Sequence, residues 1–150
     1  MQNSIVNKLS RGHSAAFRIY IIGILFIGFS YGCGPNENKS NEHLQLGIDK
    51  TFAARHQEAL KEFNKAIKYN PESSEAYYYR GACKRNLKDI DGSIEDYKKS
   101  IELDPNYAEP YFSLGLLYDY LQDRSLACFY YRKAEALGRP NTDEYTRWCN

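Results

Sequence analysis

Apolar and small residues recur at steps of three and four in the part of the chain that follows residue 40. The segments Ala59–Ile67 and Ile94–Ile101 both show this spacing, which gathers apolar side chains on one face of an α-helix. Pro71 and Pro105 follow soon after these segments. Because proline lacks a backbone N–H and disfavours helix at the preceding residue, each proline is predicted to end a helix. The pattern therefore predicts short amphipathic helices separated by turns.

The pattern repeats with a period of 34 residues, shown most clearly by Gly47, Gly81 and Gly115. A glycine inside a helix costs about 1 kcal/mol relative to alanine, so these positions need a structural reason. We expect each glycine to let the second helix of a hairpin approach closely, opposite the small residue that follows twelve positions later. An aromatic residue and a second small residue complete each unit; the recurring positions are Ala59, Ser93 and Ala127, then Phe63, Tyr97 and Tyr131, then Ala66, Ser100 and Ala134.

This repeat resembles the tetratricopeptide repeat, a helix-turn-helix unit of about 34 residues with small, aromatic and proline positions in this order. The resemblance implies an all-α fold, a short right-handed α-solenoid of three repeats, because hairpins must stack to bury their apolar faces. The expected repeats span residues 40–73, 74–107 and 108–141. A short capping helix is expected within residues 142–150, with Tyr145 covering the last hairpin together with Trp148. A frayed tail is the alternative.

The N-terminal segment has a different character. A basic stretch precedes an uncharged apolar run at residues 19–32, which is shorter than the roughly 20 apolar residues that span a bilayer. This arrangement is typical of a secretory signal peptide, here residues 1–32. Gly32-Cys33 at its end resembles the cleavage site of bacterial lipoproteins, which implies that Cys33 carries the lipid and that residues 33–39 form a flexible linker. The alternatives are a conventional signal peptide, giving a secreted protein, and an uncleaved signal anchor.

The lipoprotein resemblance also implies a location. The chain would be lipid-anchored to a membrane of the cell envelope. Gly34 is not the acidic residue that retains some lipoproteins at the inner membrane, so the outer membrane is favoured.

The remaining cysteines, Cys83, Cys128 and Cys149, lack the close spacing of zinc or redox motifs. We interpret them as small buried apolar residues. At most one pair can be bridged, and Cys128 with Cys149 is the pair that we favour. Whether that disulfide forms is left open by the sequence.

No catalytic arrangement is evident. His43 and His56 are too far apart in sequence to suggest a metal pair, and there is no glycine-rich phosphate loop or serine-nucleophile motif. The 20 basic and 19 acidic residues are mixed along the chain, which argues against a nucleic-acid partner. We therefore expect no enzyme activity, cofactor, metal or small-molecule substrate.

The second unit carries two cations, Arg80 and Lys84, on the helix stripe that should face its partner helix, where the third unit has leucine and tyrosine. A buried cation needs an opposite charge. Asp96 stands at a matching position in the second helix, and we predict an ion pair between Arg80 and Asp96, shared with Lys84. The first unit has an equivalent pair, Lys50 and Glu62, and the third has neither charge. The alternative is that these charges are solvated.

In tetratricopeptide repeats the first helices line a concave groove. The positions implied by the resemblance are mostly apolar or aromatic, and a large exposed apolar patch usually marks an interaction surface. They are Leu44, Ile48, Phe52, Tyr78, Arg85, Phe112, Leu116 and Tyr120.

These positions imply an exported module that binds another protein, through an apolar or aromatic segment held by Tyr78, Phe112 and Tyr120. Chaperone-binding family members clamp a terminal carboxylate with Lys and Asn where this chain has Leu44 and Ile48, so that specificity is not expected. One alternative is that the stripe is covered by the linker or packs between repeats. Another is that the chain braces an envelope assembly as a structural subunit that uses no groove.

Overall fold

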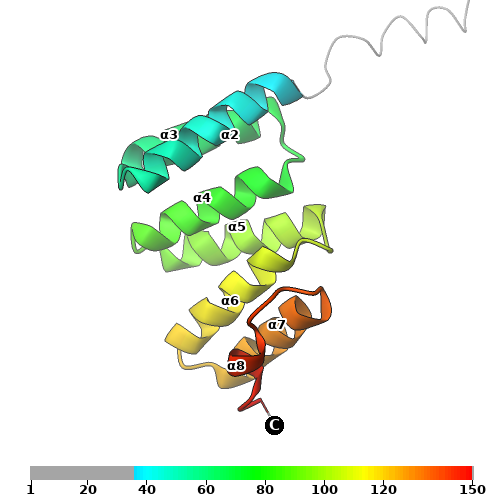
Figure 1. Cartoon of the computed structure of the whole chain (residues 1–150). Coiled ribbons are helices and arrows are strands. Elements are labelled where there is room, and N and C mark those ends of the chain that lie inside the picture. The colour runs from blue at the N-terminus through cyan, green and yellow to red at the C-terminus, as the bar shows by residue number, and fades with distance from the viewer. Residues whose placement is uncertain (1–35, 150) are drawn as a thin grey trace, which may run out of the picture. The chain divides into compact units, whose positions relative to one another are not determined.

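The computed structural model of the chain describes residues 36–149. The expected signal peptide and Cys33 lie outside the described residues. Seven helices and no strands are present in the described part, and six of the helices pair into three hairpins that follow one another along a stack (Figure 1). The hairpins are α2 with α3, α4 with α5, and α6 with α7. The helices are α2 (Glu37–Phe52), α3 (His56–Tyr69), α4 (Ser74–Asn86), α5 (Ile90–Leu103), α6 (Ala108–Tyr120), α7 (Arg124–Ala136) and α8 (Asp143–Thr146).

Side-chain caps and a repeated turn set the helix boundaries. Asp89 and Asp123 each accept a hydrogen bond from a backbone N–H of the first turn of α5 and α7, at 3.0 Å. The turn inside each hairpin contains a residue with positive φ, namely Ala54 (56°), Lys88 (68°) and Gln122 (64°). These three residues are 34 apart, so one turn geometry is used three times.

The first helix begins earlier than expected. Glu37–Lys39 were predicted as linker, but they belong to α2, which Asn36 caps through a hydrogen bond from the Lys39 N–H at 3.1 Å. Ser40 is fully buried and donates from its hydroxyl to the Ala66 carbonyl at 3.0 Å. Because this contact fixes Ser40 against α3, the preceding turn is held in helical conformation.

The repeated glycines make room for aromatic rings. A Cβ on Gly81 would lie 2.9 Å from a ring carbon of Tyr97, and one on Gly115 would lie 2.5 Å from the Tyr131 ring; the Phe63 ring occupies the equivalent place at Gly47. The small residue that we expected opposite each glycine is also fully buried, but the atoms nearest to the glycine belong to the ring that follows this small residue by four positions. The ring needs the space, because it fills the core of each hairpin and is fully buried.

The two ends of the stack differ. In α4, buried Ala76 and Cys83 face the preceding hairpin, whereas the equivalent positions of α2 are Glu42 and Asp49, both exposed. At the other end, Tyr145 of α8 packs edge-on against Phe112 with ring centroids 4.9 Å apart. The polar α2 face and the short α8 thus act as end caps of the kind that repeat proteins need.

The predicted ion pair of the second hairpin lies in contact. Asp96 is buried, and its carboxylate accepts two hydrogen bonds from the Arg80 guanidinium, at 2.6 and 2.8 Å, while Lys84 Nζ lies 3.0 Å from it. Burial acts to lower the pKa of Arg80, but the hydrogen bond and charge of Asp96 outweigh it and raise that pKa. Arg80 also donates to Asn64 of α3 at 3.0 Å, so the pair links two hairpins. In the third hairpin, stacked Tyr118 and Tyr130 rings occupy the equivalent positions.

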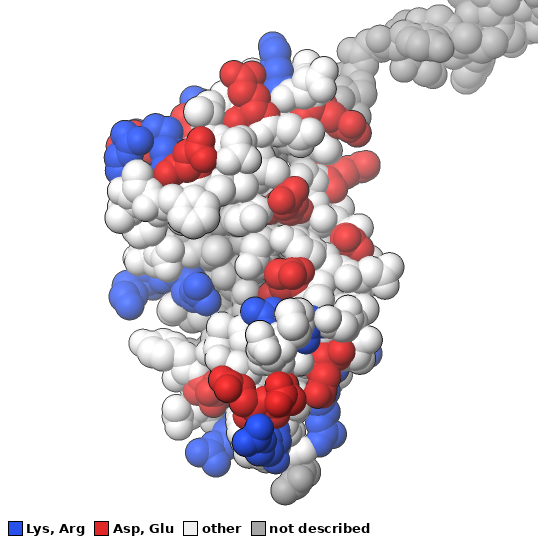
Figure 2. Space-filling view, viewed as in Figure 1, with Lys and Arg blue, Asp and Glu red and all other residues white. Residues whose placement is uncertain are grey.

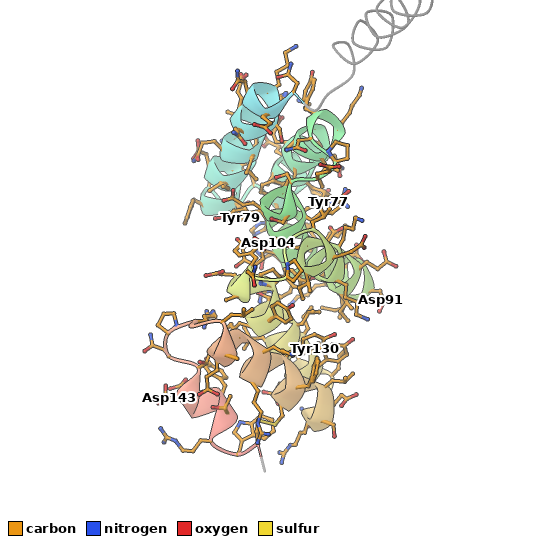
Figure 3. All side chains as sticks on the ribbon, turned by 90° about the vertical axis from the view of Figure 1, so that its right-hand side faces the viewer. Tyr77, Tyr79, Asp91, Asp104, Tyr130 and Asp143 are labelled. Atoms are coloured by element: carbon orange, nitrogen blue, oxygen red, sulfur yellow. A yellow bond between two sulfur atoms is a disulfide. The ribbon has the colours of Figure 1, made fainter. Side chains whose placement is uncertain are left out.

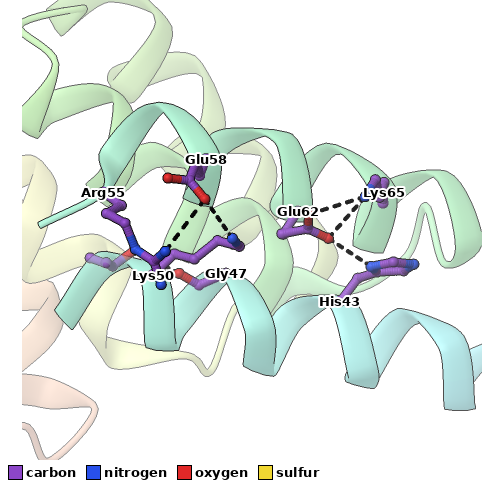
Figure 4. A network of polar contacts seen from close by, with 8 residues as sticks. His43, Gly47, Lys50, Arg55, Glu58, Glu62 and Lys65 are labelled. Atoms are coloured by element: carbon purple, nitrogen blue, oxygen red, sulfur yellow. Dashed lines mark hydrogen bonds and ion pairs between the residues drawn. The ribbon is translucent and has the colours of Figure 1, made fainter. Parts of the chain in front are cut away.

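The equivalent pair expected in the first hairpin does not form. Lys50 instead contacts Glu58 at 2.7 Å, and Glu62 contacts His43 at 2.9 Å and Lys65 at 3.1 Å (Figure 4). The two helices run antiparallel, so Lys50, near the turn, lies opposite the acid nearer the turn. The second hairpin has Gly92, with no side chain, at the position of Glu58, which leaves Lys84 free to reach the acid further along.

Replacing Gly115 with alanine should lower the free energy of unfolding. The overlap with the Tyr131 ring should cost about 3 kcal/mol, the upper end of the usual range, because the fully buried ring cannot move aside; this exceeds the gain of about 1 kcal/mol from the helix propensity of alanine. Urea unfolding followed by circular dichroism measures the change. In a Tyr131→Leu background the same substitution should cost far less. Equal costs in both backgrounds would contradict the proposed overlap.

Removing the acid from the buried ion pair should be strongly destabilising. Asp96→Leu leaves Arg80 without its partner and should cost about 3 kcal/mol, whereas the double variant Arg80→Leu/Asp96→Leu should cost much less. A double-mutant cycle measures the coupling. As a control, Glu102→Leu in the exposed pair with Lys99 should cost at most about 0.5 kcal/mol. Additive costs at Arg80 and Asp96 would show that the pair does not stabilise the fold.

Candidate functional site

Two of the three residues predicted as anchors for a partner, Tyr78 and Phe112, have half-buried or buried rings. Phe112 is only 7% exposed and packs against Tyr131 at 5.5 Å between ring centroids. Tyr78 is half-buried and contacts Tyr79 and Tyr107 edge-on, at 5.1 and 5.2 Å. Both rings therefore contribute to packing: Phe112 contacts a ring of α7, and Tyr78 contacts Tyr107 just before α6. Phe112 therefore leaves almost no surface for a partner, and the role of Tyr78 as a partner-binding anchor stays a prediction.

The other predicted groove residues divide in a similar way. Leu44 is buried in the core of the first two hairpins, and Ile48 packs on the same core. Phe52 and Tyr120, at the C-terminal ends of α2 and α6, are 88% and 70% exposed. The exposed part of the predicted stripe is therefore confined to the ends of the first helices.

A cavity of about 660 Å³ lies at the C-terminal ends of α4 and α6, and His56 at the start of α3 also lines it. Arg85, Leu116 and Tyr120 line it and belong to the predicted groove, so the structure brings three of the eight residues together. The sequence analysis missed the rest of the lining, because these residues lie outside the first-helix stripe: two at helix starts, one in the repeated turn, one at the end of α4 and one inside α6. They are His56, Asn86, Lys88, Ile90 and Leu117.

The lining combines positive charge with apolar surface. Arg85 and Lys88 are its charged members, and no acidic residue is among the residues that line it. His56 Nδ1 is buried and has no hydrogen-bond partner within residues 36–149. The acidic residues Glu75 and Glu109 lie in the first turns of α4 and α6, at the opposite ends of these helices. Figure 2 shows this separation: acidic side chains follow one another down the viewed face, with basic ones toward its left edge and lower end.

Tyrosine rings are numerous on the second and third hairpins. Tyr77 and Tyr79 leave α4 in different directions, and Tyr130 lies on α7 of the next hairpin (Figure 3). Burial raises the pKa of Tyr79, and also that of Tyr107. These phenols are therefore neutral at neutral pH and serve as packing groups. No cluster of three potential metal-ligating side chains occurs in the described part of the chain.

The disulfide left open by the sequence is present between Cys128 and Cys149, and Cys83 is a free, buried thiol. Among the described helices, none combines the length and apolar character needed to cross a membrane.

Three consecutive helical hairpins with one repeated glycine–ring contact define the molecule as a helical-hairpin repeat protein. Sequence profiles described as TPR repeat and Tetratricopeptide repeat match it at residues 62–95, 84–119 and 108–137. The chain is a tetratricopeptide repeat protein. No curated protein matches its sequence.

Solved structures with the same fold include two kinds of protein. The first TPR of Spaghetti (RPAP3), bound to the HSP90 peptide SRMEEVD, aligns with a TM-score of 0.73 at 19% identity, over 77% of this chain and 94% of that one. A crystal structure of MamA aligns with a TM-score of 0.64 at 21% identity, over 75% and 77% of the two chains. A second MamA structure gives 0.62 at 26% identity, over 67% and 55%. These similarities establish an all-α solenoid of tetratricopeptide repeats.

Alanine substitutions at Phe112 and Tyr120 should separate core from surface. Phe112→Ala removes a buried ring and should cost about 3–5 kcal/mol of unfolding free energy. Tyr120→Ala removes an exposed ring and should change it by no more than about 0.5 kcal/mol. Thermal and urea unfolding of the two variants measure the difference. A stable Phe112→Ala protein would restore that ring as a candidate contact for a partner.

Proposed function

We propose that this chain is an exported, membrane-anchored module that binds a segment of a partner protein at the cavity formed by Arg85, Leu116 and Tyr120. Tetratricopeptide repeats are a protein-interaction fold, and the fold here is of that type. The observation that carries the proposal is the coincidence of an exposed ring, an apolar wall and two cations in one cavity. Such a combination of apolar surface with a few orienting polar groups is typical of a binding site.

The lining indicates the chemistry of the bound segment. Leu116 and Tyr120 offer a surface for an apolar or aromatic side chain, as expected from the sequence. Arg85 and Lys88 stand beside them and suit a carboxylate or backbone carbonyls of the same segment. The RPAP3 structure holds a peptide in a related fold, which supports the capacity of such a stack to bind an extended segment. Because Leu44 and Phe112 are buried and offer no surface, the bound segment would lie near the helix ends.

The first experiment compares co-purification from native membranes. Tyr120→Ala combined with Arg85→Gln should remove the bound partner while leaving thermal unfolding unchanged, because both side chains lie at the cavity surface. The control is Lys61→Gln combined with Lys68→Gln, two exposed residues of α3. Retention of the same partner by the cavity variant would contradict the binding site. It would favour the alternative of a structural subunit that uses no groove.

The proposed anchor is a lipid on Cys33. Because α2 begins at Glu37, a lipidated Cys33 would lie within about 15 Å of the first helix even with a fully extended chain between them. The repeats would therefore work close to the membrane surface, with the outer membrane favoured.

Cys33→Ser should release the protein from membranes or leave an unprocessed precursor. Cell fractionation and the mass of the mature chain distinguish these forms from the lipidated one. Unchanged membrane association and the same precursor mass for both proteins would contradict lipidation and favour a signal anchor.

A further inference from the structure

A second cavity, also of about 660 Å³, lies on the outer face of α7 at the end of the stack. Its floor is a stripe of α7 that faces away from α6, and its wall is the segment after α8, coloured red in Figure 1. The tetratricopeptide groove described above does not include it. The lining residues are Arg124, Ser125, Cys128, Phe129, Arg132, Lys133, Ala136, Trp148 and Cys149.

The charge of this stripe differs from that of the same stripe in the second hairpin. In α5 the stripe has acidic residues at three positions, Asp91, Glu95 and Glu102, mixed with two lysines. In α7 the corresponding residues are serine, phenylalanine and alanine, while both basic positions remain basic and Arg124 replaces an isoleucine. The cavity is therefore lined by three cations and no acid.

Two aromatic rings lie beneath these cations. The Arg124 guanidinium stands 5.7 Å from the Trp148 ring centroid, and Lys133 Nζ stands 5.9 Å from that of Phe129. The rings remain 39% and 51% exposed. Rings that already carry a cation on one face present an apolar surface next to a positive charge.

The disulfide builds the wall of this cavity. Cys149 is bonded to Cys128 on α7, which holds the adjacent Trp148 beside Arg124. Arg132 donates a hydrogen bond to the Cys149 carbonyl and fixes the same segment. Without the disulfide, the short α8 and the Arg132 hydrogen bond would be left to hold this segment against the third hairpin.

We propose that this cavity binds an acidic segment of a partner protein that carries an aromatic or large apolar side chain. The carboxylates would pair with Arg124 and Lys133, and the apolar side chain would lie on Phe129 and Trp148. Several exposed cations, none of them buried, suit a segment with several charges better than a single small anion.

Other occupants fit less well. A flat bilayer would not reach rings that line a hollow, and three cations are few for nucleic acid, whose affinity grows with the number of phosphates neutralised. The chain's own N-terminal segment has no acidic residue before Glu37 and cannot supply the charges. A second copy would offer Asp49 and the exposed Phe52 of α2, and dilution of the chain tests that case below.

Trp148 is the only tryptophan of the chain, so its fluorescence reports on this cavity alone. The full chain in non-ionic detergent is titrated with the capped peptide Asp-Glu-Phe-Glu-Asp and with its amide counterpart Asn-Gln-Phe-Gln-Asn. The acidic peptide should give a saturable change in emission that weakens with added salt, and the amide peptide should give none. No saturable change, or equal changes with both peptides, would overturn the proposal.

Matched charge removal locates the site. Arg124→Gln/Lys133→Gln should raise the Kd by about tenfold, as expected for two exposed charges. Lys61→Gln/Lys68→Gln on α3 removes the same charge and should leave Kd within about twofold, as should Tyr120→Ala in the other cavity. Equal weakening by the α3 pair would overturn the site. The Trp148 emission is also measured with inorganic phosphate, with mixed micelles that contain phosphatidylglycerol, and on dilution of the chain without peptide. A change as large as that given by the acidic peptide in any of these measurements would overturn the acidic segment as the occupant.

Removing the disulfide tests the proposed cavity independently of its charges. Cys128→Ser/Cys149→Ser, with the helical circular dichroism of the stack retained, should raise the Kd for the acidic peptide by about tenfold or more. This change keeps every cation, so it tests the wall of the cavity and not its charge. An unchanged Kd in that variant would overturn the role assigned to the Trp148 segment.

Discussion

The contact between a glycine of the first helix and an aromatic ring of the second is the constraint on which each hairpin depends. The Tyr131 ring fills the volume that a Cβ on Gly115 would take, and the other two hairpins repeat the arrangement. Because the ring is wholly buried, it fixes both the separation of the two helices and their register. Everything that faces across a hairpin follows from that register.

The register explains why similar charges find different partners. An antiparallel pair places a residue near the turn opposite another near the turn, so Lys50 meets Glu58. Where glycine replaces that glutamate, Lys84 reaches Asp96, and the buried acid also holds Arg80. The same geometry brings the ends of the first helices together with the starts of the second ones. That is where the cavity lined by Arg85 and Tyr120 forms, at the ends of α4 and α6 that lie opposite their acidic first turns.

Much of this architecture could be predicted from the sequence, because period and charge are both readable there. The ring and glycine positions mark the hairpins, and the joint appearance of Arg80 and Asp96 indicates a pair. The site was harder to predict. A position on a helix does not tell whether a ring such as Tyr78 bridges to a neighbour, and the repeat pattern says nothing about the turn residue Lys88 or the helix start at His56, which line the cavity.

The central claim is that partners bind at the exposed ends of the first helices. The most direct measurement replaces Tyr120 with a photoreactive amino acid in the full chain, and replaces Lys68 on α3 in a control protein. The account predicts that irradiation of cells joins a partner protein to position 120 and not to position 68. No product at position 120, or the same product from both positions, would contradict it.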